Sequence, residues 1–303
     1  MPRVAGASTW RDVAVLHRFE FPLPVCYACQ ASWGACFAAG GVPGLLDPPV
    51  LAAVAANLLL IPSGLALNTA VDVRTDERNR DKSYLAAAVT RFGRTRTLRW
   101  VAAEMAAGLA LAIAIALWSG RWLVTVAAAL SIAAHLLYNL EPVRLKRRGF
   151  AGAGVFGLSM ATLPGLLSYY AIQSGLEATI WLIFAGLGVL IAGRMTWWSV
   201  PDRAADIATG MTTPVVRYGV TRTLVLSSLI MLAGLVLLAW GLWSRYGPVW
   251  MVPPVAVNAM VLGGALALLR PAAAITTSGV LKRTMPLVMI ADLLLVIVPL
   301  TAG

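Results

Sequence analysis

The chain has 303 residues, of which 59% are hydrophobic and only 12% are charged, and its formal net charge is +11. Soluble globular proteins carry about 25% charged residues, so this composition excludes an ordinary soluble protein and predicts an integral membrane protein. The basic excess does not indicate binding to nucleic acid, because the basic residues lie mainly in the segments that connect hydrophobic runs.

Nine hydrophobic runs come close to the ~20 residues that a membrane-spanning helix needs. In chain order they cover residues 21–41, 49–70, 100–118, 122–140, 151–172, 177–197, 223–243, 248–268 and 283–301. The sequence therefore predicts an all-α fold, a polytopic bundle of nine transmembrane helices in contact with membrane lipid.

The basic residues predict how this bundle lies in the membrane. Of the 24 Lys and Arg residues, only Arg121 and Arg245 fall between runs on one side, which leaves 22 on the side of the N-terminus. Basic residues gather on the cytoplasmic side of membrane proteins. We therefore predict a multi-pass protein of the plasma membrane, with its N-terminus and its functional site facing the cytoplasm.

The second hydrophobic run ends in a motif of polar residues, Asn68-x-x-x-Asp72-x-x-x-Asp76. Residues four apart share one face of a helix, so the motif points three oxygen-bearing side chains in one direction. A carboxylate in a membrane costs roughly 3 kcal/mol on insertion scales. A divalent cation bound through oxygens removes that cost, and Mg²⁺ that also holds a phosphate is the usual occupant.

Basic side chains follow the first motif at once, at Arg78, Arg80 and Lys82. Acidic residues that hold a metal, next to basic residues that neutralise phosphate charge, are what a Mg²⁺–diphosphate complex needs. A solvated charged loop would explain the charges but not the regular spacing of the motif.

A second acidic motif, Asp202-x-x-x-Asp206, follows the sixth hydrophobic run and is itself followed by Arg217. Alone this spacing is weak evidence, because it occurs by chance on many helices. Both motifs fall at the same predicted face of the membrane, and that coincidence favours one shared site.

The two halves of the chain also resemble each other. The segment Ala88-Val-Thr-Arg-Phe-Gly93 follows the first motif, and the similar segment Pro214-Val-Val-Arg-Tyr-Gly219 follows the second. We predict a single integral membrane domain over residues 1–303, made of two pseudo-repeated halves at about 1–145 and 146–303. In such repeats the site often lies at the interface between the halves.

Together the two motifs resemble those of the UbiA superfamily of intramembrane prenyltransferases. The stretch from Tyr138 to Gly149 also looks like the family's segment between its fourth and fifth helices. The resemblance implies a helical bundle around a central cavity that binds Mg²⁺ and an isoprenyl diphosphate. It implies that the catalytic and metal-binding residues are Asn68, Asp72, Asp76, Asp202 and Asp206. It places Tyr138, Arg144 and Lys146 with the substrate.

The mechanism that the resemblance implies is ionisation of the allylic C–O bond, with departure of diphosphate. An aromatic or lipid acceptor then attacks the allylic cation in a cavity without water. Aromatic faces stabilise cations, and the candidates are Trp197 and Trp198 before the second motif, with Phe156, Tyr169 and Tyr170. The two tryptophans are equally compatible with a place in the interfacial belt.

Two other functions stay open from the sequence. A terpene cyclase of the same superfamily would keep the site but let the cation cyclise without an acceptor. A cation transporter would need acidic residues on both sides of the membrane, whereas here they gather among basic residues on one side. The sequence leaves the roles of Glu104, His135 and Asp292 undecided.

Overall fold

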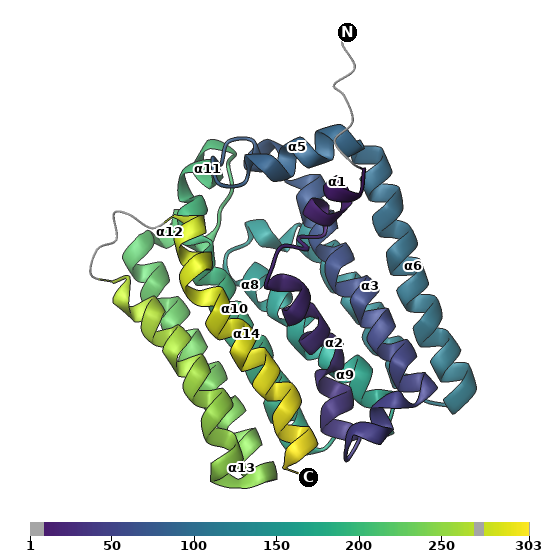
Figure 1. The fold of residues 1–303 in the computed structure, drawn as a ribbon. Coiled ribbons are helices and arrows are strands. Elements are labelled where there is room, and N and C mark those ends of the chain that lie inside the picture. Colours follow the sequence, from purple (N-terminus) through teal and green to yellow (C-terminus); the bar gives the residue numbers. More distant parts are fainter. Residues whose placement is uncertain (1–8, 270–275, 303) are drawn as a thin grey trace.

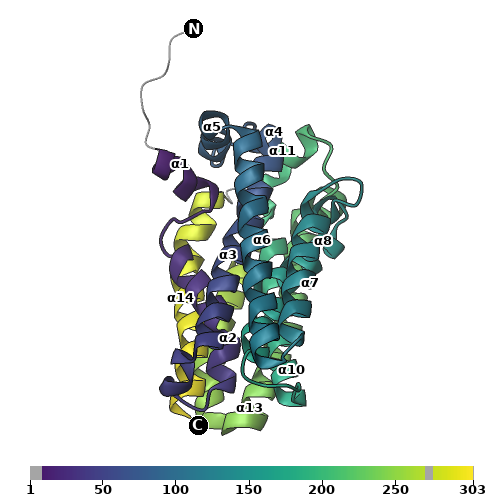
Figure 2. The ribbon, with the colours of Figure 1, turned by 90° about the vertical axis from the view of Figure 1, so that its right-hand side faces the viewer.

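The computed structural model describes residues 9–269 and 276–302, and these form helices and no strand (Figure 1). Arg3 and Arg270, two of the basic residues used to predict the orientation, lie outside the described residues. The long helices run side by side as one elongated bundle, which Figure 2 shows from the side. The all-α prediction is confirmed for the described residues.

The long helices of the bundle are α2 (Leu23–Ala38), α3 (Pro48–Val71), α6 (Arg94–Ser119), α7 (Leu123–Asn139), α10 (Ala178–Trp198), α13 (Val220–Ala267) and α14 (Thr277–Thr301). A further rod consists of α8 (Phe150–Gly157), a π-helical turn at Leu158–Thr162 and α9 (Leu163–Tyr170). These helices are hydrophobic on all sides, as expected for segments buried in protein or in lipid.

Short helices join the long ones at one end of the bundle (Figure 1). They are α1 (Thr9–Leu16), α4 (Val73–Asp76), α5 (Ser83–Phe92), α11 (Arg203–Ala208) and α12 (Pro214–Tyr218). Three short 3₁₀ turns cover Val42–Leu46, Leu145–Arg147 and Val200–Asp202. Both acidic motifs therefore lie at this end, where the long helices give way to short ones.

Six helical stretches among the described residues are long and apolar enough to cross a membrane. Helices α2 and α7 are shorter, with 16 and 17 residues. Helix α13 covers two of the predicted spans, and its backbone leaves the helical region at Gly247, where φ is +80°. Glycine adopts this conformation without a steric penalty, and Pro248 can begin a new helix behind it. The number of nine transmembrane helices stays a prediction.

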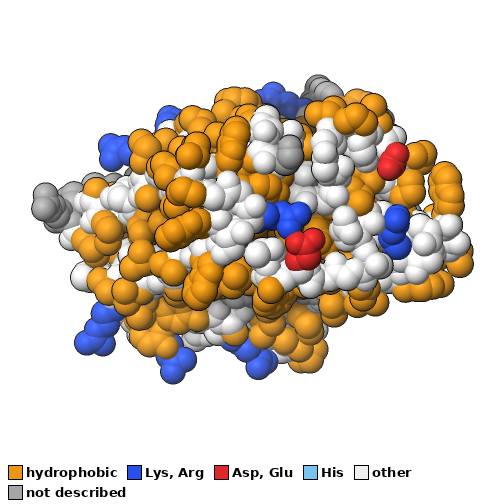
Figure 3. Space-filling model, turned by 90° about the horizontal axis from the view of Figure 1, so that it is seen from below, with side chains coloured by type: hydrophobic (Ala, Val, Ile, Leu, Met, Phe, Trp, Pro, Cys, Tyr) orange, Lys and Arg blue, Asp and Glu red, His pale blue; other side chains and the backbone are white. Residues whose placement is uncertain are grey.

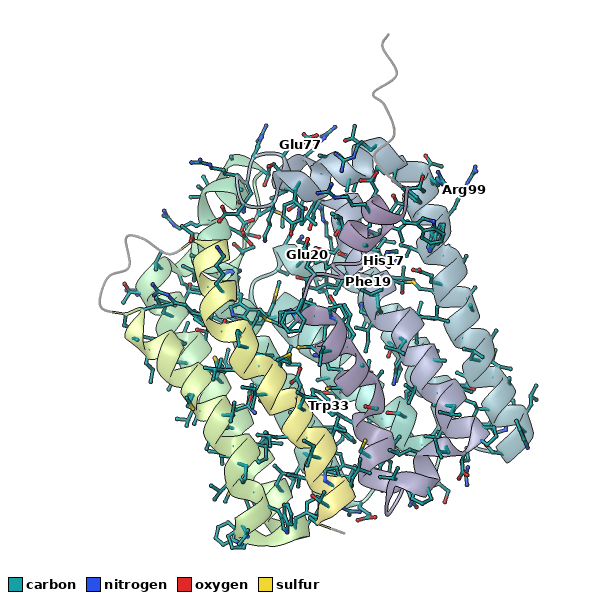
Figure 4. All side chains as sticks on the ribbon, viewed as in Figure 1. His17, Phe19, Glu20, Trp33, Glu77 and Arg99 are labelled. Atoms are coloured by element: carbon teal, nitrogen blue, oxygen red, sulfur yellow. The ribbon has the colours of Figure 1, made fainter. Side chains whose placement is uncertain are left out.

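Charged side chains concentrate at the end that carries the short helices, where many nitrogen- and oxygen-tipped side chains are visible in Figure 4. The opposite end, seen in Figure 3, is mostly hydrophobic or uncharged. Helix α1 lies at the charged end, and the last turn of α14 lies at the other. This polarity is what a bundle that crosses a bilayer with its basic side inward is expected to show.

Candidate functional site

A cavity of about 260 Å³ opens at the charged end of the bundle and extends between the long helices. All five residues of the two acidic motifs line it: Asn68, Asp72, Asp76, Asp202 and Asp206. Its remaining wall is largely apolar and includes Leu65, Phe156, Met160, Ile191, Met285 and Val288. A polar mouth and an apolar interior thus share one chamber.

The first motif is held together by contacts around Asp72, which is buried at the end of α3. Asn68 donates an amide hydrogen bond to Asp72 Oδ2 (2.9 Å). Arg144 donates to Asp72 Oδ1 (3.1 Å), and Lys146 forms an ion pair with Oδ2. Burial alone would raise the pKa of Asp72, but the charges of Lys146 and Arg144 outweigh it and lower that pKa. Asp72 is therefore an ionised carboxylate.

The second motif is tied to the segment that follows the first. Lys82 forms an ion pair with Asp202 Oδ2 (2.6 Å), and the Asn79 amide donates to Asp202 Oδ1 (2.8 Å). Within the second motif, the Thr213 hydroxyl donates to Asp206 Oδ2 (2.8 Å). Residues 120 or more positions apart in the chain thus meet at the mouth of the cavity.

Asp76 is a buried carboxylate of the first motif that forms no ion pair among the described residues. Its side chain is 6% exposed, and its Oδ2 atom has no hydrogen-bond partner among the described residues. Burial raises the pKa of Asp76 to about 6, and the nearby Arg18 opposes that rise only in part. A buried carboxylate oxygen without a partner is costly, so this atom is suited to receive a cation.

The oxygen donors of the two motifs fit Mg²⁺ better than they fit a metal held by protein alone. Among the described residues, no three His, Cys, Asp or Glu side chains are close enough to enclose a metal by themselves. Mg²⁺ seldom uses such a cage, since it usually takes one or two carboxylates together with phosphate oxygens and water. The unpartnered Asp76 oxygen and the all-oxygen donor set agree with that mode.

The structure brings several predicted substrate residues to the cavity. Lys82, Tyr138, Lys146 and Trp198 line it, and Arg144 reaches it through Asp72. Phe156 also lines the cavity and packs against Tyr138, with ring centroids 5.6 Å apart.

Four other residues that the sequence suggested for the substrate lie elsewhere. Arg78 and Arg80 are exposed, and Arg78 donates to the Ala208 carbonyl instead of pointing inward. Arg217 is exposed beside its neighbour Tyr218, and the Trp197 side chain is buried in an apolar cluster. Consecutive helix positions point in different directions, which is why Trp198 reaches the cavity and Trp197 does not. We leave these four residues out of the proposed site.

The other aromatic candidates, Tyr169 and Tyr170, do not line the cavity. The Tyr169 hydroxyl donates to Glu177 (3.4 Å), which precedes α10, and both rings pack in apolar clusters. The sequence grouped them with Phe156 because all three lie in the same hydrophobic run. Of these three, only Phe156 lines the cavity.

The structure adds cavity residues that the motifs did not indicate, among them Arg18, Gln30, Asn79 and Arg194. Asn139 also contributes, because it accepts a hydrogen bond from Asn68 (3.0 Å) and so fixes that amide. Arg18 precedes the first long helix, and Arg194 lies within α10. Neither belongs to a recognisable motif, so only their unusual place next to or inside a hydrophobic run could have singled them out.

Of the residues left undecided, Glu104 is paired with His17 (3.0 Å) and accepts from the indole of Trp100 (2.8 Å). His135 is buried against Gly64 on α3. Asp292 lies buried inside the bundle, and the indole of Trp33 donates to its backbone carbonyl (3.1 Å).

Comparisons with known proteins show that several solved structures share this fold. The chain resembles a solved UbiA homolog from Archaeoglobus fulgidus bound to DMAPP and Mg²⁺, with a TM-score of 0.68 and 14% identity over 96% of this chain and 99% of that one. The GPP- and Mg²⁺-bound structure of that homolog gives a TM-score of 0.69 and 15% identity, covering 95% of this chain and 99% of that one. A structure of digeranylgeranylglyceryl phosphate synthase gives 0.67 and 15%, covering 96% of this chain and 99% of that one.

These likenesses are of fold, since the identities are low, and no curated protein matches the chain. The family model described as the UbiA prenyltransferase family matches residues 28–277, a stretch that contains both acidic motifs. The chain is therefore a member of the UbiA prenyltransferase family.

Proposed function

We propose that this chain is a Mg²⁺-dependent intramembrane prenyltransferase that ionises an isoprenyl diphosphate and transfers the prenyl group to an aromatic or lipid acceptor. The observation that carries the proposal is the meeting of two distant acidic motifs, each with its own lysine, at the mouth of one apolar cavity. Fold relatives bound to DMAPP or GPP with Mg²⁺ support it.

Asn68, Asp72, Asp76, Asp202 and Asp206 are the residues proposed to hold Mg²⁺. Bound there, Mg²⁺ would neutralise charge on the diphosphate oxygens and so make diphosphate a better leaving group. Asn139 keeps the Asn68 amide oriented, and Thr213 does the same for Asp206.

Basic side chains of the mouth are proposed to bind the diphosphate. Lys82, Arg144 and Lys146 already lie on the carboxylates that would hold the metal, so each can exchange a carboxylate oxygen for a phosphate oxygen over a short distance. Below them, the apolar wall would receive the prenyl chain and exclude water from the allylic cation. Tyr138, Phe156 and Trp198 present aromatic rings to that space.

A terpene cyclase is the second candidate, and the aromatic rings along the cavity are the observation in its favour. It differs from a transferase only in what quenches the cation. The two candidates differ in their need for an acceptor. A cyclase converts the isoprenyl diphosphate to a hydrocarbon or alcohol without one.

We also propose that the protein lies in the plasma membrane with the N-terminus and the cavity mouth toward the cytoplasm, and that residues 1–303 act as a single domain of two pseudo-repeated halves. The charged end of the bundle, which carries both motifs, supports this orientation.

The test of the catalytic proposal is replacement of Asp72 by Ala, with release of inorganic pyrophosphate from isoprenyl diphosphates as the measurement. Pyrophosphate release is expected to fall by about 100-fold or more, because the substitution removes the buried Asp72 carboxylate that is proposed to hold Mg²⁺. Glu77→Ala is the matched control, since Glu77 is an exposed acidic residue of the same segment. Undiminished release by Asp72→Ala would reject the proposal.

The identity of the quenching group is tested by mass spectrometry of the products. Isoprenyl diphosphates of graded length are supplied with Mg²⁺, alone and with aromatic or lipid acceptors. Products that contain the acceptor support the transferase, and cyclic hydrocarbons or alcohols formed without acceptor support the cyclase.

A further inference from the structure

Arg194 is a buried arginine in the cavity wall whose hydrogen bonds are incomplete. It lies on α10, is 4% exposed and lines the cavity. Its Nε and Nη1 atoms have no hydrogen-bond partner among the described residues. Buried donors that remain unpaired are costly in a low-dielectric interior, and a charged group is the most costly of all. The structure therefore contains a strong donor site that is ready for an acceptor of hydrogen bonds.

This donor site is distinct from the mouth of the cavity. Arg194 precedes Asp202 by eight residues, which corresponds to about 12 Å along a helical chain. The carboxylates of the two motifs have their own basic partners, Lys82, Arg144 and Lys146. Arg194 takes part in none of those ion pairs.

The residues around Arg194 provide further donors. Its guanidinium lies 5.9 Å from the centre of the Trp198 ring, and Trp198 also lines the cavity. The indole N–H of Trp198 has no hydrogen-bond partner among the described residues either. Two side chains of the cavity lining, about one helical turn apart on α10, thus carry buried N–H groups without a hydrogen-bond partner among the described residues.

Asp292 on α14 supplies the countercharge, but it does not satisfy the guanidinium. The charge of Arg194 acts on the Asp292 carboxylate, and Cys26 and Gln30 are its hydrogen-bonding neighbours. No ion pair joins Arg194 and Asp292 within 4 Å, and Asp292 Oδ2 has no hydrogen-bond partner among the described residues. Asp292 is absent from the cavity wall, whereas Arg194, Cys26 and Gln30 are part of it. Asp292 therefore lies outside the cavity lining and acts on the guanidinium through its charge, without an ion pair within 4 Å.

We propose that Arg194, together with Trp198, binds an anionic oxygen group of the prenyl acceptor, either a carboxylate or a phosphate, and that Asp292 is a positioning residue for the guanidinium. The inference rests on the proposed transferase function and narrows the class of acceptor. Guanidinium forms its best hydrogen bonds with such groups, and burial strengthens them. A fixed positive charge at this level would instead repel a carbocation that cyclises beside it.

The test compares anionic acceptors with neutral partners of the same shape. The probes are a hydroxybenzoate with its methyl ester, and a prenylated glycerol phosphate with the corresponding glycerol ether. These pairs separate a carboxylate from a phosphate source. The wild-type protein is expected to prenylate one anionic probe in preference to its neutral partner.

Arg194→Gln is expected to raise the KM for the preferred anionic probe by roughly 10- to 100-fold, the usual range for a lost hydrogen bond to a charged group. The KM for the isoprenyl diphosphate is expected to change much less, and Arg194→Lys is expected to recover part of the loss. Arg222→Gln is the matched control, because Arg222 is exposed on α13 and outside the cavity wall.

The variant Arg194→Gln leaves Asp292 without its countercharge and can therefore fail to fold. The double variant Arg194→Gln with Asp292→Asn removes both charges and keeps the measurement possible. If Arg194 and Asp292 only stabilise the fold, the double variant regains the wild-type KM for the acceptor. If Arg194 binds the acceptor, that KM stays high.

The inference would be overturned if Arg194→Gln raised the KM values for the acceptor and for the isoprenyl diphosphate equally, or if the double variant regained the wild-type KM for the acceptor. Equal use of anionic and neutral probes by the wild type would also overturn it. Failure of the wild type to prenylate either anionic probe would overturn it as well. The proposed function fails separately, when the wild type releases no pyrophosphate in the presence of Mg²⁺.

Discussion

At the scale of single residues, the site depends on side chains whose charges are balanced before any substrate is present. Asp72 has two basic partners and Asp202 has one, while Asp76 keeps an oxygen without a partner. The three carboxylates are therefore not equivalent, although the sequence spacing treats Asp72 and Asp76 alike. Asp76 is a position where a bound cation is favoured, because its buried Oδ2 atom has no hydrogen-bond partner among the described residues.

Asp76→Asn tests this difference. The amide keeps the shape of the side chain but removes its negative charge, so the Mg²⁺ concentration needed for half-maximal pyrophosphate release is expected to rise about tenfold or more. Glu77→Gln, an amide substitution at the exposed neighbour, provides the comparison. An unchanged Mg²⁺ requirement would remove Asp76 from the proposed metal site.

His17 gives the protein a dependence of stability on pH. Burial lowers the pKa of His17, but the hydrogen bond and the charge of Glu104 outweigh it, so the pKa lies above the ordinary 6.5. The stabilising effect of protonated His17 is complete below pH 6.5 and is lost as pH rises through the higher pKa of the folded protein.

The measurement is the thermal midpoint of detergent-solubilised protein from about pH 6 to about pH 9. The difference between wild type and His17→Asn is expected to shrink as pH rises. In a Glu104→Gln background the same substitution should give a smaller and flatter difference. A gap that widens with pH would contradict the assignment of the pair.

The sequence indicated the residues of the motifs but not their partners. Four-residue spacing follows from helix geometry, so Asn68, Asp72 and Asp76 could be recognised from the chain alone. Asn139, Arg18 and Arg194 could not, because their place in the site depends on residues more than 50 positions away in the chain. The basic residues after the first motif show the same limit: Lys82 turns inward while Arg78 and Arg80 do not.

At the scale of helices, close backbone approach fixes the walls of the cavity. A Cβ atom on Gly34 of α2 would lie 1.8 Å from the Gly165 carbonyl oxygen and 2.4 Å from the Tyr169 nitrogen, both on α9. The nearby Asn57 amide of α3 donates to carbonyls on both of these helices, at Ala31 (3.0 Å) and Pro164 (2.9 Å). Small residues and buried amides are the usual means by which helices pack in lipid.

Gly34→Ala is therefore expected to destabilise the protein by about 1–3 kcal/mol, the usual effect of overpacking, since backbone atoms cannot move aside easily. Gly154→Ala on α8 is the control, because a Cβ there meets nothing within 4 Å. That substitution is expected to be neutral or slightly stabilising, as Ala favours helix over Gly. Thermal midpoints in detergent provide the comparison, and equal midpoints for both variants would refute the packing argument.

Hydrophobic runs located the helices well, but their ends and breaks depended on other features. The runs 223–243 and 248–268 predicted two spans with a short connection at Arg245, and the structure has them within α13, which is broken at Gly247. The rod over 150–170 contains a π-helical turn that hydropathy does not register. Hydropathy reports lipid contact, whereas these details depend on local backbone geometry and packing.

At the scale of the whole molecule, charge separates the two ends of the bundle and predicts its orientation. Single cysteines at Glu77 and Gly175 test it, because both positions are exposed, one beside the first motif and one before α10. The native Cys26, Cys29 and Cys36 are buried, and replacing them with Ala ensures that only the introduced cysteine can be labelled.

A membrane-impermeant maleimide applied to intact cells is expected to label Gly175→Cys and not Glu77→Cys. Inverted membrane vesicles should give the opposite pattern. Labelling of Glu77→Cys from outside would reverse the proposed orientation.

The pairing of Lys146 with Asp72 and of Lys82 with Asp202 has a consequence for the order in which reactants arrive. If either lysine moved to a bare diphosphate, Asp72 would keep only Arg144 as its ionic partner and Asp202 would have none, and weaker compensation of a poorly solvated carboxylate costs free energy. Exchange becomes favourable when a replacement cation comes in the same event. The protein thereby discourages premature capture of diphosphate, and isoprenyl diphosphates should bind poorly when a chelator removes divalent ions.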